Sequence, residues 1–258
     1  MAFMKLSNRD AWGRPKRYQS AADAKMSPYN GNDIYTKALL HFDGINNSAV
    51  ITDSGIYPTR TWTANGNAVI STAKTEAWGG ACLILDGSGD YVSTADSSDF
   101  AIGTGAFTDE IRCWPSAIGG LRAIIDRRIA DNSYGYVLRL NGNAWTVAIG
   151  TTTVITASST PSTSKFTHLA VVGNGGSSGL RTIKLYVDGV LAGTYTTDYN
   201  FTSTRIRIGT YWGSSSDYFA GWLDECRLSA QDRTANVRDM LYVAYGATSF
   251  TPPTKAYK

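Results

Sequence analysis

Two pairs of adjacent carboxylates stand in strand-like segments of this chain, Asp109-Glu110 and Asp224-Glu225. A glycosidase that retains configuration uses two carboxyl groups about 5–5.5 Å apart, one as acid and one as nucleophile. Neighbouring residues of a β-strand point to opposite faces of the sheet, so neither pair should converge on one sugar. The spacing of the acids therefore predicts that the protein is not an enzyme of this kind.

Histidine, cysteine and glycine patterns favour no other catalytic arrangement. His41 and His168 stand in apolar segments, where an imidazole is usually a core or edge residue bonded to a backbone group. The three cysteines lack metal-ligand spacing and are expected to be buried free thiols; a Cys82–Cys226 disulfide is the alternative if their strands are neighbours. The glycine-rich turn at 173–176 precedes no helix, so it is not a phosphate-binding loop.

The segment 211–218 combines aromatic rings with hydroxyl and carboxylate groups. Aromatic rings stack on sugar faces while nearby polar groups fix the orientation of the sugar. The predicted glycan-binding residues are the three rings of this segment: Tyr211, Trp212 and Tyr218. Trp62 and Tyr57 form a second aromatic combination. The alternative is structural, because tryptophan and tyrosine also cover sandwich ends and subunit interfaces.

Short strands must position these residues, because the 258-residue chain is 43% hydrophobic, only 17% charged and rich in turn residues. Residues 182–187 alternate, Asp188-Gly189 supplies a two-residue type I′ turn, and residues 190–195 return. Asn141-Gly142 predicts a second hairpin, and the spacing over 232–245 predicts one short C-terminal helix. The predicted fold class is an all-β antiparallel sandwich.

The N-terminal region differs from the remainder in charge and pattern. Residues 1–37 carry seven basic side chains against three acidic ones, a net charge of +4, and show no regular hydrophobic period. They are interpreted as an extended arm that docks on a partner; packing on its own domain, or a solvated tail, are the alternatives. Nucleic acid is a weak candidate at this charge. The predicted partner-binding residues are Trp12, Arg14, Lys16, Arg17 and Tyr18.

Six stretches in a fixed order resemble a known family. They are LLHFDG at 39–44, WGG at 78–80 with LILDGSGDYV at 83–92, FTDE at 107–110, THLAVV at 167–172, KLYVDGVL at 184–191 and GWLDECRL at 221–228. Over about residues 37–247 the chain resembles a concanavalin A-like lectin/glucanase domain of the laminin-G-like type. The resemblance implies a jelly-roll sandwich over these residues. The charge and proline patterns outside it predict the arm at 1–36 and an extended tail at 248–258. Residues 245–253 further resemble laminin-G-like proteins encoded by bacteriophages.

Relatives of this fold often hold calcium with an acid near the first strand and another on the last. By position the resemblance implies Asp43 and Asp224 as ligands, with Asp90 as a further candidate, and calcium would be structural. The alternative is that Asp43 caps a tight turn, as Asp86 and Asp188 would. Where relatives have an apolar run, this chain has an arginine, Arg112, expected to pair with Glu110 two residues back on the same strand face.

These features together predict a non-enzymatic bacteriophage virion structural protein. Its arm would anchor it to other virion proteins of the capsid or tail, and the lectin-like sandwich would serve as decoration or contact host-surface glycans. Many copies per virion imply a homo-oligomer. No stretch approaches the roughly 20 apolar residues of a membrane span, and the start lacks an apolar secretion segment. A cellular carbohydrate-binding module is the alternative, and a glycoside hydrolase is the third hypothesis.

Overall fold

The protein is described by a computed structural model over residues 34–55, 60–74, 77–129, 135–176, 179–198, 200–213 and 216–233. Strands dominate this part of the chain, and helix is limited there to two short 3-10 turns, η1 at Trp78–Gly80 and η2 at Ser98–Phe100. The strands are β1 Thr36–Leu40, β2 Val50–Ile51, β3 Trp62–Asn65, β4 Val69–Ser71, β5 Cys82–Asp86, β6 Tyr91–Thr94, β7 Ala106–Pro115, β8 Leu121–Asp126, β9 Tyr136–Asn141, β10 Ala144–Ile149, β11 Thr152–Thr156, β12 Thr167–Asn174, β13 Arg181–Val187, β14 Val190–Thr197, β15 Arg207–Ile208 and β16 Ala220–Ser229.

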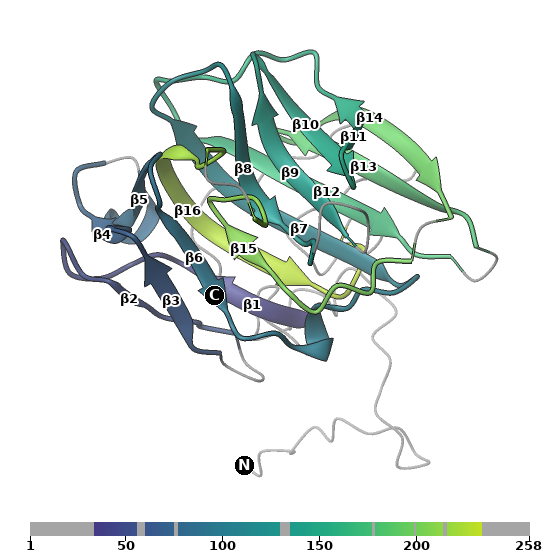
Figure 1. Cartoon of the computed structure of the whole chain (residues 1–258), viewed down its shortest axis with the longest axis horizontal. Coiled ribbons are helices and arrows are strands. Elements are labelled where there is room, and N and C mark those ends of the chain that lie inside the picture. Colours follow the sequence, from purple (N-terminus) through teal and green to yellow (C-terminus); the bar gives the residue numbers. More distant parts are fainter. Residues whose placement is uncertain are drawn as a thin grey trace, which may run out of the picture.

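The strands form two antiparallel sheets that stack as a sandwich (Figure 1). Sheet I has the order β14-β13-β12-β7-β16-β5-β4, with β1 also paired to β16. Sheet II has the order β11-β10-β9-β8-β15-β6-β3-β2. Strands that are distant in sequence are neighbours in both sheets, as in the pairing of β16 with β5 and β7. The predicted all-β sandwich class is confirmed.

Alternation along the strands separates the core from the outer faces. In β9, Leu138 and Leu140 belong to the main core cluster, whereas Val137 packs in a separate cluster with Ala123 and Tyr211. Burial of apolar area is the largest favourable term in folding, so these period-2 patterns fix which face of each strand turns inward. Arg139 lies between Leu138 and Leu140, and the same alternation turns its side chain to the outer face of sheet II.

The two predicted hairpins are present, one with a shifted turn. β13 and β14 pair through Val187 and Val190, and Asp188 and Gly189 have φ of 47° and 79°, the left-handed pair that a type I′ turn requires. β9 and β10 pair through Asn141 and Ala144, so the two-residue loop is Gly142-Asn143 rather than Asn141-Gly142. Gly142 has φ of 60°, which glycine adopts without steric cost.

The three cysteines are free and buried, as expected: Cys82, Cys113 and Cys226. Although β5 and β16 are neighbours, Cys82 packs in the cluster with Trp114 and Phe166, whereas Cys226 belongs to the main core. The two thiols therefore lie on opposite faces of sheet I, which prevents the disulfide. Residues 1–33 of the predicted arm at 1–36 and the C-terminal residues 234–258, including nearly all of the expected helix over 232–245, lie outside the described residues.

Two local expectations are wrong. Arg112 does not pair with Glu110: its Nη1 donates to Asp224 Oδ2 at 3.0 Å, while Glu110 contacts Arg227 and His168. Adjacent strands, not the same strand, bring these charges together, since Arg112 faces Asp224 in the β7–β16 register.

The histidines are also bonded differently from the expectation, because each imidazole contacts a carboxylate where a backbone group was expected. The Nδ1 of His41 lies 2.9 Å from Glu225 Oε1, and the Nε2 of His168 lies 3.3 Å from Glu110 Oε2. Glu225 has φ of 48° at a register shift in β16. This bulge interrupts the alternation on which the separation of Asp224 from Glu225 rested. Asp109 and Glu110 keep the expected opposite directions, because Asp109 contacts Arg127 and Tyr136 instead.

Candidate functional site

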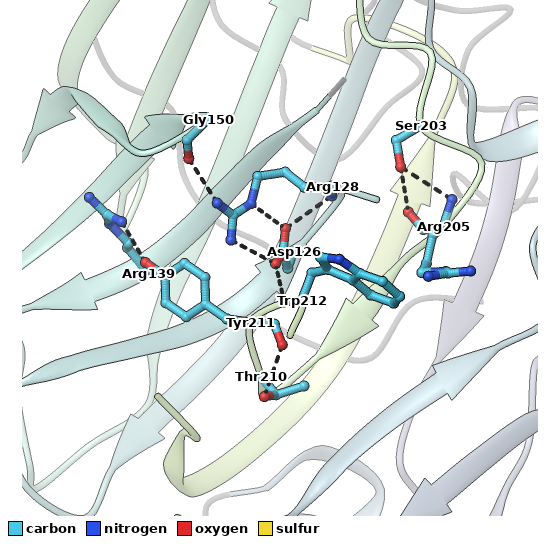
Figure 2. Close-up of polar contacts among 9 residues, drawn as sticks. All are labelled: Asp126, Arg128, Arg139, Gly150, Ser203, Arg205, Thr210, Tyr211 and Trp212. Atoms are coloured by element: carbon cyan, nitrogen blue, oxygen red, sulfur yellow. Dashed lines mark hydrogen bonds and ion pairs between the residues drawn. The ribbon is translucent and has the colours of Figure 1, made fainter. Parts of the chain in front are cut away.

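A pocket of about 320 Å³ opens on the outer face of sheet II. Its walls come from the start and end of β8, from β9, from the β10–β11 turn and from the loop between β15 and β16. Figure 2 shows four of the lining residues, Arg128, Arg139, Tyr211 and Trp212, together with Asp126 and the Gly150 carbonyl. The lining residues are Leu121, Arg128, Arg139, Thr151, Tyr211, Trp212, Gly213 and Asp217.

Asp126, the last residue of β8, holds the pocket wall in place. Its Oδ2 accepts the backbone N–H of Trp212 at 2.8 Å, which ties the β15–β16 loop to sheet II. Both of its oxygens accept from the Arg128 guanidinium, at 2.8 Å from Nε and 2.9 Å from Nη2. This bidentate pair is almost fully buried, and Arg128 Nη1 donates to the carbonyl of Gly150 at 2.8 Å (Figure 2). The charge of Arg128 is therefore balanced and its position fixed.

Arg139 is bonded in another way. Its guanidinium donates to three hydroxyl oxygens: Thr146 at 3.3 Å, Tyr211 at 2.5 Å and Thr153 at 2.6 Å. The residue is 5% exposed, and no carboxylate of the described residues lies within ion-pair distance of it. Tyr211 is equally buried, and burial raises the pKa of its phenol while the Arg139 charge opposes that shift. The pocket floor therefore presents a fixed cation whose partners are all neutral.

Trp212 forms the rim of the pocket together with two arginines. The guanidinium carbons of Arg205 and Arg207 lie 4.2 Å and 4.4 Å from its ring centroid. Arg205 is also held by Asp96 through two bonds of 2.8 Å and 2.9 Å, and this pair lowers the pKa of Asp96. The rim is thus aromatic and positively charged at once.

The structure brings two of the three predicted glycan-binding residues into the pocket. Tyr211 contributes its hydroxyl to the Arg139 bond, and its buried ring offers no open face for stacking. Trp212 lines the rim and is half-buried. Tyr218 is not a lining residue: its ring stacks on Tyr91 with centroids 6.5 Å apart. Of the second combination, Trp62 is a core residue and Tyr57 lies outside the described residues.

Sequence reasoning missed Asp126, Arg128 and Arg139. A signal for Arg139 is present, because an arginine between two leucines in an alternating strand must face outward. Asp126 and Arg128 carry no such signal, since they form their pair only after β8 ends beside Gly150 and Trp212. The β15–β16 loop and β8 meet through tertiary folding, which the spacing of residues in the sequence does not predict.

The predicted calcium ligands separate into two places. Asp43 and Asp224 both contact η1: a Cβ on Gly79 would collide with the Asp43 carboxylate, and the Trp78 N–H donates to Asp224 Oδ2 at 2.9 Å. Asp90 lies in the β5–β6 turn instead, where its oxygens accept backbone N–H groups from Asn67 at 2.7 Å and Asp86 at 2.9 Å. Asp90 therefore closes a turn away from the other two acids.

The Asp43–Asp224 arrangement fits a cation in two respects. Asp224 Oδ1 is buried and has no hydrogen-bond partner within the described residues. Burial raises the pKa of Asp224 to about 7, and Glu225 and Asp43 add to the rise, so the Trp78 hydrogen bond and the Arg112 charge offset only part of it. Burial also raises the pKa of Asp43. No group of three or more acidic, histidine or cysteine ligands suited to a metal occurs among the described residues, so further ligands would be backbone carbonyls or water.

The two antiparallel sheets and a pocket on the outer face of one of them define a lectin-like sandwich. The chain belongs to the concanavalin A-like lectin/glucanases superfamily, whose laminin-G-type branch matches residues 86–236, more than half of the sequence. No curated protein sequence matches it significantly. Within the described residues, no helix is long and apolar enough to cross a bilayer.

Solved structures of the same fold come from toxins and from an enzyme module. The binding domain of botulinum neurotoxin serotype D/C is 15% identical (TM-score 0.57) over 81% of this chain and 51% of its own. That of Paraclostridial Mosquitocidal Protein 1 is 12% identical (TM-score 0.61) over 82% and 52%. This chain thus spans about half the length of these toxin domains. Domain 4 of the Geobacillus stearothermophilus arabinanase AbnA, solved with arabinotriose, is 18% identical (TM-score 0.54) over 76% and 93%. Such identities show the fold alone.

Proposed function

We propose that this protein binds glycans, without catalysis, through the pocket of Arg139, Tyr211 and Trp212. The observation that carries the proposal is the pocket itself, where a half-buried indole borders fixed N–H and hydroxyl groups. Sugars are recognised by such a combination of an aromatic wall and a few placed polar groups. The AbnA module of the same fold, solved with arabinotriose, supports a sugar as the ligand class.

The pocket is largely preformed, which favours binding of a small, rigid group. Asp126 fixes both Arg128 and the backbone of Trp212, so little side-chain freedom would be lost when a sugar enters. The hydroxyls of Thr151, at the β10–β11 turn, and Tyr211, over β9, can accept or donate hydrogen bonds. A single sugar residue would contact the indole edge and these groups, with the remainder of the glycan in solvent.

The test is binding of the purified full-length chain to a glycan array, followed by calorimetry with the best ligand. Trp212→Ala should reduce affinity at least tenfold, because it removes the aromatic wall. The matched control is Tyr195→Ala, which removes a partly exposed ring from β14 in sheet I and should leave affinity unchanged. Unchanged glycan affinity in Trp212→Ala would contradict binding at this pocket. An equal loss of affinity in Trp212→Ala and Tyr195→Ala would show that the loss does not come from the pocket, and would also contradict the proposal.

We also propose a structural calcium at Asp43 and Asp224. The support is the unpartnered Oδ1 of Asp224 beside a second carboxylate. Bound calcium would supply positive charge to both carboxylates and tie β16 to η1. Millimolar calcium should raise the melting temperature of the chelator-treated protein, and Asp224→Asn should remove that rise. Asp90→Asn is the matched control for charge; because Asp90 lies at a different turn, the calcium-dependent rise should persist in it.

The finer proposal is a bacteriophage virion protein, with the sandwich displayed and the N-terminal arm docked on the capsid or tail. Its support is the phage-like ending at 245–253 and the basic arm with Trp12, Arg14, Lys16, Arg17 and Tyr18, all outside the described residues. Co-sedimentation with particles stripped of this protein should retain the full-length chain and lose a chain that begins at residue 37. Equal sedimentation of both chains, or of neither, would contradict anchoring by the arm.

A further inference from the structure

Arg139 is bonded differently from three other buried arginines of the described residues. Arg127, Arg128 and Arg227 are buried and each contacts a carboxylate: Asp109, Asp126 and Glu110 respectively. Arg139 is equally buried, yet its three partners are hydroxyl oxygens. Arg181 also contacts no carboxylate within the described residues, but it packs over the Phe201 ring and does not line the pocket. Arg139 is therefore a buried cation that faces an opening.

The bonding of Arg139 leaves capacity for a ligand. A guanidinium carries five N–H groups, and three of them donate to Thr146, Tyr211 and Thr153, which leaves two without an acceptor among the described residues. Removing a cation from water without an opposite charge is costly, and the hydroxyls compensate only part of that cost. A ligand oxyanion would supply both the acceptors and the charge, because carboxylates and sulfates accept paired N–H groups from arginine.

The neighbouring charged residues that the structure describes do not supply a negative charge to Arg139. Arg128 is neutralised by Asp126, so neither contributes a free charge to the pocket. Arg205 and Arg207 add positive charge at the Trp212 rim, and within the described part of the chain only Arg205 has a bound carboxylate, Asp96. Asp217, the one acidic residue among the described lining residues, lies beyond ion-pair distance of Arg139. An anion approaching the pocket therefore meets a rim of the opposite sign.

We infer that the glycan bound by this pocket carries an oxyanion substituent, a carboxylate or a sulfate, that docks on Arg139. The inference rests on the proposed glycan-binding function and adds the charge class of the ligand. The carboxylate or sulfate oxygens would accept the two remaining N–H groups of Arg139. The sugar ring that bears them would contact Trp212 at the rim.

The first arm of the test compares matched acidic and neutral glycans on the wild-type chain. The pairs are sialylated and desialylated oligosaccharides, oligogalacturonate and its methyl ester, and sulfated and unsulfated galactans. The acidic member should bind at least tenfold more tightly, and the preference should shrink as salt rises. Uronate and sialyl pairs distinguish a carboxylate from a sulfate. Equal binding, or binding of neutral members alone, would overturn the inference but leave glycan binding intact; no binding at all would refute both.

The second arm assigns the preference to Arg139. Arg139→Gln should lower affinity for the acidic member at least tenfold more than it lowers affinity for the neutral member. Lys165→Gln is the matched control, because it removes one exposed positive charge near the β13–β14 turn of sheet I. Asp217→Asn should raise affinity for the acidic member. An unchanged preference in Arg139→Gln would overturn the inference, and if that variant fails to fold, the Asp217→Asn result and the glycan pairs decide it.

Discussion

Sheet I and sheet II each carry an outward-facing arginine among aromatic rings, and the two arginines differ in one respect. In sheet I, the guanidinium of Arg112 lies 3.8 Å from the Trp78 ring centroid and 4.8 Å from that of Phe166, and it donates to Asp224. In sheet II, Arg139 lies 5.9 Å from the Tyr211 ring centroid and donates to hydroxyls only. Among the residues that the structure describes, the first arginine has a counter-ion and the second has none.

This difference separates a packing feature from a binding site more clearly than aromatic content does. The Arg112 region has more aromatic rings, since Trp114 and Trp222 also lie there. The Lys74 ammonium lies 3.5 Å from the ring centroid of Trp114 and 4.1 Å from that of Trp222. Its cations already occupy the ring faces that a ligand would use. The Arg139 region has fewer rings but a cavity and an unbalanced charge. Charge compensation is thus the more informative criterion for a ligand site.

The largest expected effect comes from making Arg128 resemble Arg139. Asp126→Asn removes the carboxylate from a buried bidentate pair, and breaking such a pair costs about 3–5 kcal/mol. Urea unfolding should show this loss, together with weaker glycan binding because Trp212 loses its anchor. Asp96→Asn is the matched control: it breaks an exposed arginine pair, so we expect a loss below about 1 kcal/mol. Similar losses of unfolding free energy in Asp126→Asn and Asp96→Asn would contradict the expected difference between a buried and an exposed arginine–carboxylate pair.

Asp224, the counter-ion of Arg112, should give a pH dependence of a few kcal/mol. Its pKa is about 7 in the folded chain and 3.8 as the unperturbed value, so the folded state holds the proton more tightly. With calcium chelated, the free energy of unfolding should fall as pH rises from about 4 through 7, at about 1.4 kcal/mol for each pKa unit. Asp224→Asn should remove this fall. If added calcium leaves the wild-type profile unchanged, the calcium proposal is wrong.

Giving Arg139 a counter-ion should make it resemble Arg112. Thr153 Oγ1 accepts from Arg139 Nη2 at 2.6 Å, so Thr153→Asp places a carboxylate at that contact. We expect the acidic glycan to lose at least tenfold in affinity, while the free energy of unfolding rises by about 1 kcal/mol. Thr153→Asn keeps the shape without the charge and should retain binding. Calorimetry and urea unfolding measure the two effects, and an Asp variant that still prefers acidic glycans would contradict the assignment of Arg139.

The smallest effect is expected at Lys74. Its ammonium contributes cation–π energy with Trp114 and Trp222, which is worth about 0.5–1 kcal/mol where the cation is partly exposed. Lys74→Met keeps the hydrocarbon stem, so thermal unfolding should show a loss no larger than this and glycan binding should not change. Tryptophan fluorescence should shift, because both rings lose the neighbouring charge. A change in glycan binding would instead assign function to the sheet I region.

Local rules predicted the sandwich and its hairpins because these features depend on period-2 burial and on turn chemistry. The alternation around Leu138 and the left-handed Asp188-Gly189 turn act within a few residues. The site depends instead on contacts between residues that are distant in the sequence. Arg139 finds Tyr211 across 72 positions of sequence, and Arg112 finds Asp224 across 112, so spacing carried no sign of either contact. The bulge at Glu225 added an irregularity that strand alternation cannot predict.

The buried cysteines give the chain an internal reporter of its own opening. Burial raises the pKa of Cys82 to about 12 and raises those of Cys113 and Cys226 well above their ordinary value, so the reactive thiolate is scarce in the folded state. Cys82 packs on the outer side of sheet I and Cys226 packs in the main core. The alkylation rates of the two thiols would therefore report two different unfolding events. Labelling of Cys82 alone would mark loosening of the outer cluster, and labelling of Cys226 would mark separation of the sheets.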